Sequence, residues 1–515
     1  MKVFSAEQFY EADKRTTEKE GISSLDLMER AGIQVFQWLH QRMQGAQAPI
    51  HIFCGIGNNG GDGLVVGRHL IEHGYQVNLY VANFTDKRSK CFLINYDRIK
   101  EITKKWPKLM KSAADFPEIA PQDIIVDALF GIGINRPPEG WVKELILFIN
   151  KQKAFTLSID MPSGLYANEV LEDREAVIQA NHTLTFQAPK LSFFLPETGT
   201  YVPYFEAIDI GLDPEYLHTT KALARVILKP EAQRFYKQRE KYAHKGTYGH
   251  VLVMGGSHGK LGAPQLTAKA AYRTGAGLVT AYIPTCGFQS FQTALPEVMT
   301  ITDGGEKCIT KASFDLSPTV IAVGMGMGVH SESKTALKEL FEKTKTPMVI
   351  DADALNCISE HSELRALIPK KSVLTPHPGE LERLVGGWKN DYEKIEKAQA
   401  LSKELDVIVL VKGANTLIVL GDDLYINSTG NPGMATGGSG DVLSGMIACL
   451  IAQGYDPLMA SIFGVYLHGS AGNLVAQEYG FEALMAGDII ASIGAAFLEL
   501  FRQEEPQASE NKKSQ

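Results

Sequence analysis

The sequence lacks the patterns that mark secreted, membrane and nucleic-acid-binding proteins. Its six cysteines are scattered without a CxxC pair, which argues against a disulfide framework or structural zinc site and is typical of a reducing compartment. Basic residues number 51 against 59 acidic ones, a net charge of -8, so charge favours neither nucleic acid nor an anionic membrane as a partner. Met1–Gln8 lacks the apolar core of a signal peptide, and no run approaches membrane-spanning length. We therefore expect a soluble, cytoplasmic protein.

Glycine, in contrast, is plentiful, and the chain is longer than one core requires. With 515 residues and 48 glycines, two or more domains are expected, with backbone that turns sharply or approaches a ligand. Two stretches alternate short apolar runs with helical periodicity, the pattern of parallel sheets covered by helices. We predict an α/β protein with a Rossmann-like αβα sandwich at 1–220, a linker at 221–240, a second αβα domain at 241–502 and a disordered tail at 503–515.

The predicted strands position the motifs that follow, because ligands of open parallel sheets bind outside the carboxyl ends of the strands. In the first domain the strands are Ile50–Cys54, Gln76–Val81, Asp123–Asp127, Thr156–Asp160 and His182–Phe186. In the second they are His250–Met254, Val320–Val323, Met348–Asp351, Val373–Thr375, Val407–Val411 and Thr416–Leu420.

A glycine-rich connection follows the first strand. Gly55, Gly57 and Gly60 satisfy GxGxxG, the pattern of a dinucleotide-binding turn, but the second strand ends at Val81 without the acid that would bind a ribose hydroxyl. The segment Asn58–Asp62 adds side-chain oxygens that a bare phosphate cradle does not need. A tight turn between strand and helix, with no ligand, is the alternative interpretation.

Two aspartates end later strands of this domain. Asp127 and Asp160 each suit a helix cap or a turn equally well. Together with the asparagine-containing loop, however, they should converge at one edge of the sheet. Oxygen ligands from Asn59, Asp127 and Ser163 suit a hard cation better than a soft transition metal.

Five spaced motifs lie in residues 1–215. They begin at Leu27, Cys54, Asp127, Asp160 and Phe186, and the last of them runs to Lys190. Together they resemble the NAD(P)H-hydrate epimerase family, which interconverts the R and S forms of hydrated NADH or NADPH. The resemblance implies that potassium is held by Asn59, Asp127 and Ser163, and that Asp160 contacts the hydrated ring. Asp160 is also our candidate for proton transfer. The implied nucleotide-binding residues are Asn58, Asn59, Gly60, Gly61, Asp62, Gly131, Ile132, Gly133, Ile134, Asn135, Arg136 and Pro137.

The second domain contains a phosphate-cradle pattern. Asn431–Asp441 reads NPGMATGGSGD and precedes an apolar helix predicted from Val442. Small residues expose backbone amides, and a helix N-terminus favours anions. An acid would repel phosphate there, so Asp441 suits a base that deprotonates a hydroxyl attacking phosphorus. An N-cap aspartate in a flexible loop is the alternative.

Two shorter motifs join this loop. Lys412 ends a strand beside a glycine, where it can reach phosphates or simply form a hairpin turn, and His377 between prolines suits a substrate contact or a packed turn. With Gly324–Gly328, these motifs resemble the ribokinase-like superfamily, specifically the ADP- or ATP-dependent NAD(P)H-hydrate dehydratases, over about residues 240–500. The resemblance implies a ribokinase-like domain that uses Mg²⁺ with ADP or ATP. The implied site residues are Ala263, Gly326, His377 and Asp441 for the hydrated nucleotide, and Lys412, Gly413, Ala414, Asn415, Thr416 and Gly440 for the adenosine phosphate.

These interpretations combine into an enzyme that epimerises hydrated NAD(P)H and dehydrates the S form through phosphorylation of the ring hydroxyl and elimination of phosphate. The rival is a small-molecule kinase that shares the Gly-Ser-Gly-Asp loop and carries a non-catalytic N-terminal binding module. A hydride-transferring oxidoreductase is disfavoured by the missing ribose acid. The choices of ADP or ATP and of NADH or NADPH stay open, and the resemblance implies a homo-oligomer.

Overall fold

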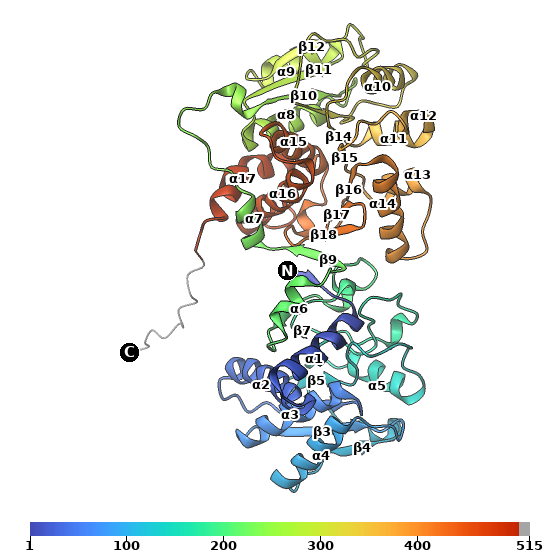
Figure 1. The fold of residues 1–515 in the computed structure, drawn as a ribbon, viewed down its shortest axis with the longest axis vertical. Coiled ribbons are helices and arrows are strands. Elements are labelled where there is room, and N and C mark those ends of the chain that lie inside the picture. Colours follow the sequence, from blue (N-terminus) through green and yellow to red (C-terminus); the bar gives the residue numbers. More distant parts are fainter. Residues whose placement is uncertain (504–515) are drawn as a thin grey trace. The chain divides into compact units, whose positions relative to one another are not determined.

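A computed structural model describes residues 1–503, so the predicted tail lies almost wholly outside the described residues. The chain forms two compact units (Figure 1). The first comprises Met1–Arg225 with Asn390–Tyr392, and the second comprises the remainder from Val226 onward. The division falls within the segment 221–240 that the sequence predicts as a linker. In the first unit, the short strand β1 (Lys2–Val3) pairs antiparallel with β9 (Ala224–Ile227), which reaches this boundary.

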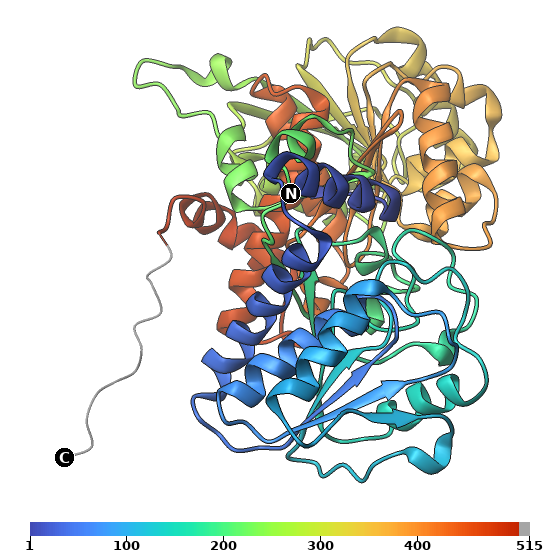
Figure 2. The same cartoon turned by 60° about the horizontal axis from the view of Figure 1, so that its bottom comes forward.

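The first unit is a three-layer sandwich around a parallel sheet (Figure 2). The strand order is β4-β3-β2-β5-β6-β7-β8, and each neighbouring pair is parallel. Apolar side chains of α2, α3 and α4 cover one face, and those of α5 cover the other. The strands are β2 (Ile50–Cys54), β3 (Val77–Ala82), β4 (Lys108–Met110), β5 (Ile124–Ala128), β6 (Phe155–Ile159), β7 (His182–Phe186) and β8 (Phe205–Ile208). The helices are α1 (Ala6–Glu20), α2 (Ser24–Met43), α3 (Asn58–Glu72), α4 (Lys90–Ile102), α5 (Gly140–Asn150) and α6 (Pro214–Thr219).

Local chemistry sets the limits of the elements that shape this unit. The hydroxyl of Ser5 accepts a hydrogen bond from the backbone of Gln8 and starts α1, and Gly21 ends the helix with φ 67°, as glycine at a C-cap does without strain. Every residue of β2 is buried, because a strand inside a parallel sheet is covered on both faces.

The second unit is also a sheet covered on both faces. Its strand order is β18-β17-β16-β15-β14-β13-β10-β11-β12. The pairs β16–β17 and β17–β18 are antiparallel and the other pairs are parallel. One core joins α8, α15, α16 and α17 to the sheet, and Figure 1 shows α10, α11, α13 and α14 on the opposite side. The predicted α/β fold is therefore confirmed.

The strands of this unit are β10 (His250–Met254), β11 (Leu278–Ile283), β12 (Met299–Thr302), β13 (Val320–Val323), β14 (Met348–Ile350), β15 (Val373–Leu374), β16 (Ile408–Val411), β17 (Leu417–Leu420) and β18 (Asp423–Asn427). Its helices are α7 (Lys229–Phe235), α8 (Gly262–Thr274), α9 (Phe288–Ala294), α10 (Ser331–Lys343), α11 (Asp353–Glu360), α12 (Ser362–Arg365), α13 (Pro378–Val385), α14 (Asp391–Leu405), α15 (Ser439–Ala452), α16 (Pro457–Tyr479) and α17 (Ala486–Glu499). Short 3₁₀ helices lie at Ala113–Asp115, Arg174–Ala176, Leu191–Phe193, Gly199–Tyr201, Lys245–Tyr248, Thr285–Gly287 and Pro432–Met434.

Two local predictions need correction. The segment Asn58–Asp62 is the first turn of α3 and not a loop. Asp441 lies inside the first turn of α15, which begins at Ser439 and not at Val442. In both cases the glycines allow the helix to begin earlier than the apolar periodicity indicates. Residues 412–416 form the turn of the β16–β17 hairpin, which is one of the two interpretations that the sequence left open.

The apolar helix α16 corrects the prediction that no run approaches membrane-spanning length. By length and composition it could cross a membrane, the one helix in residues 1–503 of which this is true. Within the protein, however, 72% of its most apolar window is buried, and it packs on α15 and α17. This is the environment of a core helix that is apolar on all sides.

Candidate active sites

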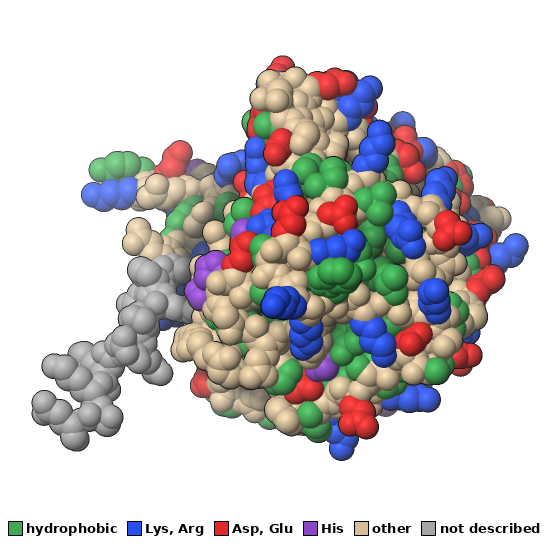
Figure 3. All heavy atoms as spheres, turned by 90° about the horizontal axis from the view of Figure 1, so that it is seen from below, with side chains coloured by type: hydrophobic (Ala, Val, Ile, Leu, Met, Phe, Trp, Pro, Cys, Tyr) green, Lys and Arg blue, Asp and Glu red, His purple; other side chains and the backbone are tan. Residues whose placement is uncertain are grey.

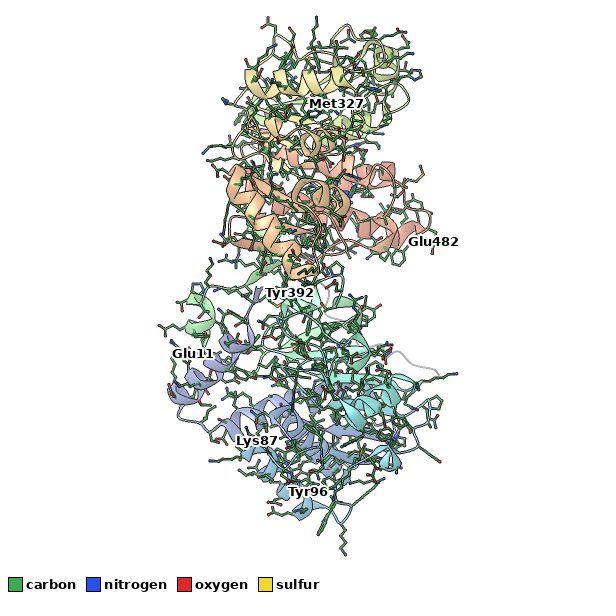
Figure 4. The ribbon with its side chains drawn as sticks, turned by 90° about the vertical axis from the view of Figure 1, so that its right-hand side faces the viewer. Glu11, Lys87, Tyr96, Met327, Tyr392 and Glu482 are labelled. Atoms are coloured by element: carbon green, nitrogen blue, oxygen red, sulfur yellow. The ribbon has the colours of Figure 1, made fainter. Side chains whose placement is uncertain are left out.

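A cavity of about 890 Å³ opens at the carboxyl ends of the first unit's strands. The strand order reverses between β2 and β5, and the loops after these strands splay apart at such a point to leave a crevice. A volume of this size suits a nucleotide-sized ligand. Lys87, which Figure 4 labels, lines the cavity from the connection between β3 and α4. Helix α1 adds Phe9, Tyr10 and Asp13 to the lining.

Most of the nucleotide-binding residues predicted for this unit line the cavity. They are Asn58, Asn59, Asp62, Asp160 and the whole of 131–137. Gly60 and Gly61 face the protein instead: a Cβ on Gly60 would lie 1.9 Å from the carbonyl oxygen of Gly55, and one on Gly61 would lie 2.6 Å from the sulfur of Met28. These two glycines therefore allow α3 to pack closely on its neighbours.

A buried ion pair lies at the centre of the cavity wall. Lys190 Nζ donates to Asp160 Oδ1 at 2.5 Å and to Thr185 Oγ1 at 2.6 Å, and Lys190 is only 1% exposed. Burial lowers the pKa of Lys190, although the charge of Asp160 opposes this shift. Asp160 has φ 66°, a conformation that non-glycine residues adopt rarely and mostly at functional sites. The sequence motif included Lys190 without assigning it a role, yet Lys190 follows β7 much as Asp160 follows β6.

Two more aspartates line the same cavity. Burial and the charge of Asp160 raise the pKa of Asp13 to about 6. The same two causes raise the pKa of Asp62 well above its ordinary value. The cavity thus gathers three aspartates around one buried ammonium group, an arrangement able to hold and move protons near neutral pH.

The three predicted cation ligands lie at the ends of adjacent strands. Asn59 Nδ2 donates to the carbonyl of Ile159 at 2.9 Å, while its Oδ1 is buried and has no hydrogen-bond partner among residues 1–503. Asp127 is completely buried and accepts hydrogen bonds from Ser163 Oγ at 2.5 Å and Ser158 Oγ at 2.8 Å. Burial raises the pKa of Asp127, and these hydrogen bonds oppose the rise. A buried carboxyl group and an unpartnered amide oxygen fit the oxygen-rich surroundings that a hard cation needs.

In the second unit, Asp351 is the centre of the charged site. It is 2% exposed and accepts hydrogen bonds from Lys412 Nζ at 2.8 Å and Ser444 Oγ at 2.7 Å. Glu380 Oε2 lies 3.8 Å from the same ammonium group. Burial alone would lower the pKa of Lys412, but the charges of Asp351 and Glu380 raise it. No role for Asp351 or Glu380 could be predicted from the sequence, although Asp351 follows a strand just as Asp160 does.

Asp441 belongs to this charged group. Burial and the charge of Asp351 raise its pKa to about 7, the range in which a carboxylate is an effective base at neutral pH. At the adjacent Gly440, a Cβ would lie 3.4 Å from Lys412 Nζ and 3.7 Å from Asp351 Oδ2. The N-terminus of α15 thus meets the lysine without an intervening side chain, which suits phosphate binding.

The structure places the other predicted dehydratase residues around this helix end. Thr267 Oγ1 lies 3.1 Å from the carbonyl of Ala263 and 3.0 Å from that of Asp441, and a Cβ on Gly326 would lie 3.3 Å from that of Ala263. Gly326 belongs to the tight loop that also contains the buried Met327, labelled in Figure 4.

The remaining predicted residues lie in two turns. His377 is half-exposed and caps α13, because its Nδ1 accepts a hydrogen bond from the amide of Gly379 at 3.1 Å. In the hairpin turn, Gly413 and Ala414 are exposed, Asn415 is half-buried and Thr416 is buried. The turn thus presents backbone, more than side chains, to the surface beside Lys412.

Two family models match this chain. Residues 24–192 match the YjeF-related protein N-terminus family, and residues 251–494 match the NAD(P)H-hydrate dehydratase family. A bifunctional NAD(P)H-hydrate repair enzyme of Moorella thermoacetica is 36% identical, with 95% of each chain covered. An enzyme with the same name from Coxiella burnetii is 34% identical, covering 95% of this chain and 97% of the other.

Among solved structures, the ADP/ATP-dependent NAD(P)H-hydrate dehydratase of Bacillus subtilis, co-crystallised with ATP and Mg²⁺, is 28% identical. The match has a TM-score of 0.48 and covers 54% of this chain and 99% of that one. The extent of the similarity to the full-length relatives establishes the family. The chain belongs to the bifunctional NAD(P)H-hydrate repair enzymes.

Proposed function

We propose that this protein repairs hydrated NADH and NADPH, epimerising the R and S hydrates in its first unit and dehydrating the S hydrate in its second at the expense of ADP or ATP. The observation that carries the proposal is the relationship, over 95% of the chain, to enzymes named for this repair. Each unit also contains a charged site with groups suited to its own half of the reaction.

In the first unit, Asp160 is the proposed proton-transfer group. It lines the cavity, and its Oδ1 atom is held by Lys190, so its second oxygen, Oδ2, is available to the substrate. Oδ2 lies near Gly131, where a Cβ would approach it to 3.3 Å. The absence of a side chain at that position leaves room for a ring beside the carboxylate.

We also propose that Asn59, Asp127 and Ser163 hold potassium. The support is the unpartnered Oδ1 of Asn59 together with the fully buried Asp127. A bound potassium ion would supply positive charge beside the nucleotide-binding loop that follows β5. The three residues keep that loop in place, since Ser163 Oγ also accepts a hydrogen bond from the amide of Phe130 at 2.8 Å.

In the second unit, Asp441 is the proposed base. It takes the proton from the hydroxyl of the hydrated ring while the hydroxyl oxygen attacks the terminal phosphate of the nucleotide. Lys412 and the first amides of α15 stabilise the phosphate charge. Phosphate is a better leaving group than hydroxide, so the ring nitrogen expels it and a ring proton is lost, which restores the double bond.

Magnesium fits this site as a partner of the nucleotide's phosphates. Residues 1–503 contain no group of three or more His, Cys, Asp or Glu side chains placed to hold a metal. This agrees with an ion that takes few protein ligands and keeps water and phosphate oxygens around it. Asp351 and Glu380, whose carboxylates lie beside Lys412, would face the bound magnesium ion. Bound magnesium would neutralise charge on the transferred phosphate.

The product distinguishes this proposal from a kinase. A kinase would leave a stable phosphorylated compound, whereas the repair enzyme releases inorganic phosphate and NADH in equal amounts. Incubation with hydrated NADH, Mg²⁺ and either ADP or ATP, with absorbance and phosphate followed together, separates the two. A phosphorylated nucleotide that accumulates without recovery of absorbance would exclude the repair reaction.

We further propose that the protein is cytoplasmic, acts without nucleic acid or membrane partners and forms a homo-oligomer. The face in Figure 3 shows acidic and basic side chains interspersed. This supports the proposal that nucleic acid is not a partner, because nucleic acid binds to surfaces where basic side chains cluster. Exposed apolar side chains on the first unit, such as Leu93, Ile94 and Trp106, are available for association with another copy. Light scattering on the purified full chain would give the subunit number, and a monomeric mass at all concentrations would contradict the oligomer. Fractionation of the cells that make it would test the location.

A further inference from the structure

Asp13 is a cavity residue that the proposed function leaves unused. It lies on α1 and lines the same cavity as Asp160 and Lys190, which come from the ends of β6 and β7. The charges of Asp160 and Lys190 act on its carboxyl group, but no hydrogen bond or ion pair among residues 1–503 holds it in place. It is partly exposed, whereas Asp62, the third aspartate in the cavity, is 8% exposed. Asp13 is therefore the aspartate more open to a ligand from the α1 side.

Epimerisation of the hydrate requires proton transfer at two places. The hydroxyl group sits on the ring carbon bonded to nitrogen, and its configuration inverts if the C–O bond breaks on one face and a new C–O bond forms on the other. An acid must protonate the departing oxygen, and a base must accept a proton from the incoming water. A single carboxyl group fixed on one side of the ring cannot reach both oxygens.

We infer that Asp13 is a second catalytic residue of the epimerase site and works with Asp160 from a different wall of the cavity. The inference rests on the proposed epimerase function. Asp13 gives its proton to the hydroxyl oxygen, the C–O bond breaks, and the lone pair of the ring nitrogen forms a C=N bond as water leaves. A second water adds to the opposite face of this carbon and passes its proton to Asp160, while the C=N electrons return to nitrogen. The reverse reaction uses the two residues in exchanged roles, so no oxidant or reductant is needed.

The charges around Asp13 suit this role. Burial and the charge of Asp160 raise its pKa to about 6, while Lys190 acts in the opposite direction. Asp62 and Tyr10 also interact with it. A carboxyl group with this pKa gives up and regains a proton close to neutral pH. Lys190 holds Oδ1 of Asp160 by a direct hydrogen bond, which leaves Oδ2 to take the proton from the incoming water.

The test measures exchange between the R and S hydrates by the full-length protein, after subtraction of the uncatalysed rate. Asp13→Asn should lower kcat at least about 100-fold, the usual contribution of one acid-base group, with little change in binding of the hydrate. Glu18→Gln, the same change at an exposed position of α1, should match the wild type. In the wild type, the rate of exchange should fall as the pH rises above about 6, where Asp13 ionises. Asp13→Glu should restore at least part of the rate and shift this pH profile. A structural role of Asp13 would not move this profile.

A wild-type rate of exchange for Asp13→Asn would overturn the inference. So would a result in which Asp62→Asn loses exchange while Asp13→Asn keeps it. A measurement on the unmodified protein keeps the inference testable if Asp13→Asn does not fold. In water labelled with ¹⁸O, every inversion should place one labelled oxygen on the ring, and inversion without the label would refute the C–O cleavage step. No exchange by the wild type at all would instead reject the proposed epimerase function, so the two failures are distinguishable.

Discussion

Replacement of Lys190 by methionine should destabilise the first unit strongly. Met is similar in length but removes the one cation among residues 1–503 in hydrogen-bond contact with Asp160. Lys190 is 1% exposed, and Asp160 is buried as well, so little water can reach the position of the ammonium group. Breaking a buried ion pair by removing one partner costs about 3–5 kcal/mol. For a unit of about 200 residues this lowers the melting temperature by about 6–20 °C.

Calorimetry of the full chain should show this shift. Lys143→Met is the matched control, because Lys143 pairs with Asp173 at 2.7 Å on the surface, where such pairs contribute little. The double variant Lys190→Met/Asp160→Asn should recover much of the loss, since it no longer buries an unpaired carboxylate. A carboxylate without its cation also prefers to take up a proton, so the deficit of Lys190→Met should shrink from pH 8 to pH 5. A shift of Lys190→Met no larger than that of the control would refute this account of the pair.

Three further predictions concern the two sites and one buried histidine of the second unit. Asp441 must be ionised to act as a base and has a pKa raised to about 7, so kcat/KM of the dehydratase should rise with pH through about 7; a rate flat from pH 6 to 8 would contradict it. Epimerase activity should fall when potassium is replaced by tetramethylammonium, and Asn59→Ala should abolish this dependence, whereas an ion-independent wild-type rate would rule out the potassium site. Burial lowers the pKa of His468 from 6.5 to about 4, so below pH 6.5 the folded second unit binds fewer protons than the unfolded chain. It should lose about 3 kcal/mol of stability between pH 6.5 and 4. His468→Gln should lessen this loss in urea titrations, and an unchanged pH dependence would refute the assignment.

The strand ends could be predicted from the sequence because their chemistry is local. Asp127 and Asp160 follow apolar runs, and the geometry of parallel sheets brings such ends together at one edge. The oxygen ligands that we expected around Asn59 come from the same kind of strand-end residues. The reaction itself was predicted from the resemblance to known families, because hydrophobic periodicity carries no information about chemistry.

The remainder depends on tertiary contacts that a linear pattern does not display. Lys190 and Asp13 lie far from Asp160 in the chain and meet it only because β7 and α1 border the same cavity. Gly60 and Gly61 looked like nucleotide contacts, but the direction in which α3 packs turns them towards the protein. Asp351 is a strand-end acid like Asp160, yet its link to Lys412 becomes visible only when β14 and the β16–β17 hairpin lie in one sheet.

The central claim, that two separate sites repair the same damaged nucleotide, is tested most directly by one measurement on a mixture of R and S hydrates of NADH. With Mg²⁺ and ADP or ATP, the wild type should restore NADH absorbance from the whole mixture and release one phosphate for each NADH formed. Asp160→Asn should rapidly restore only the NADH absorbance that comes from the S hydrate. Asp441→Ala should restore none while the two epimers still exchange. Full recovery by Asp160→Asn at the wild-type rate, or any rapid recovery by Asp441→Ala, would contradict the division of the repair between the two sites.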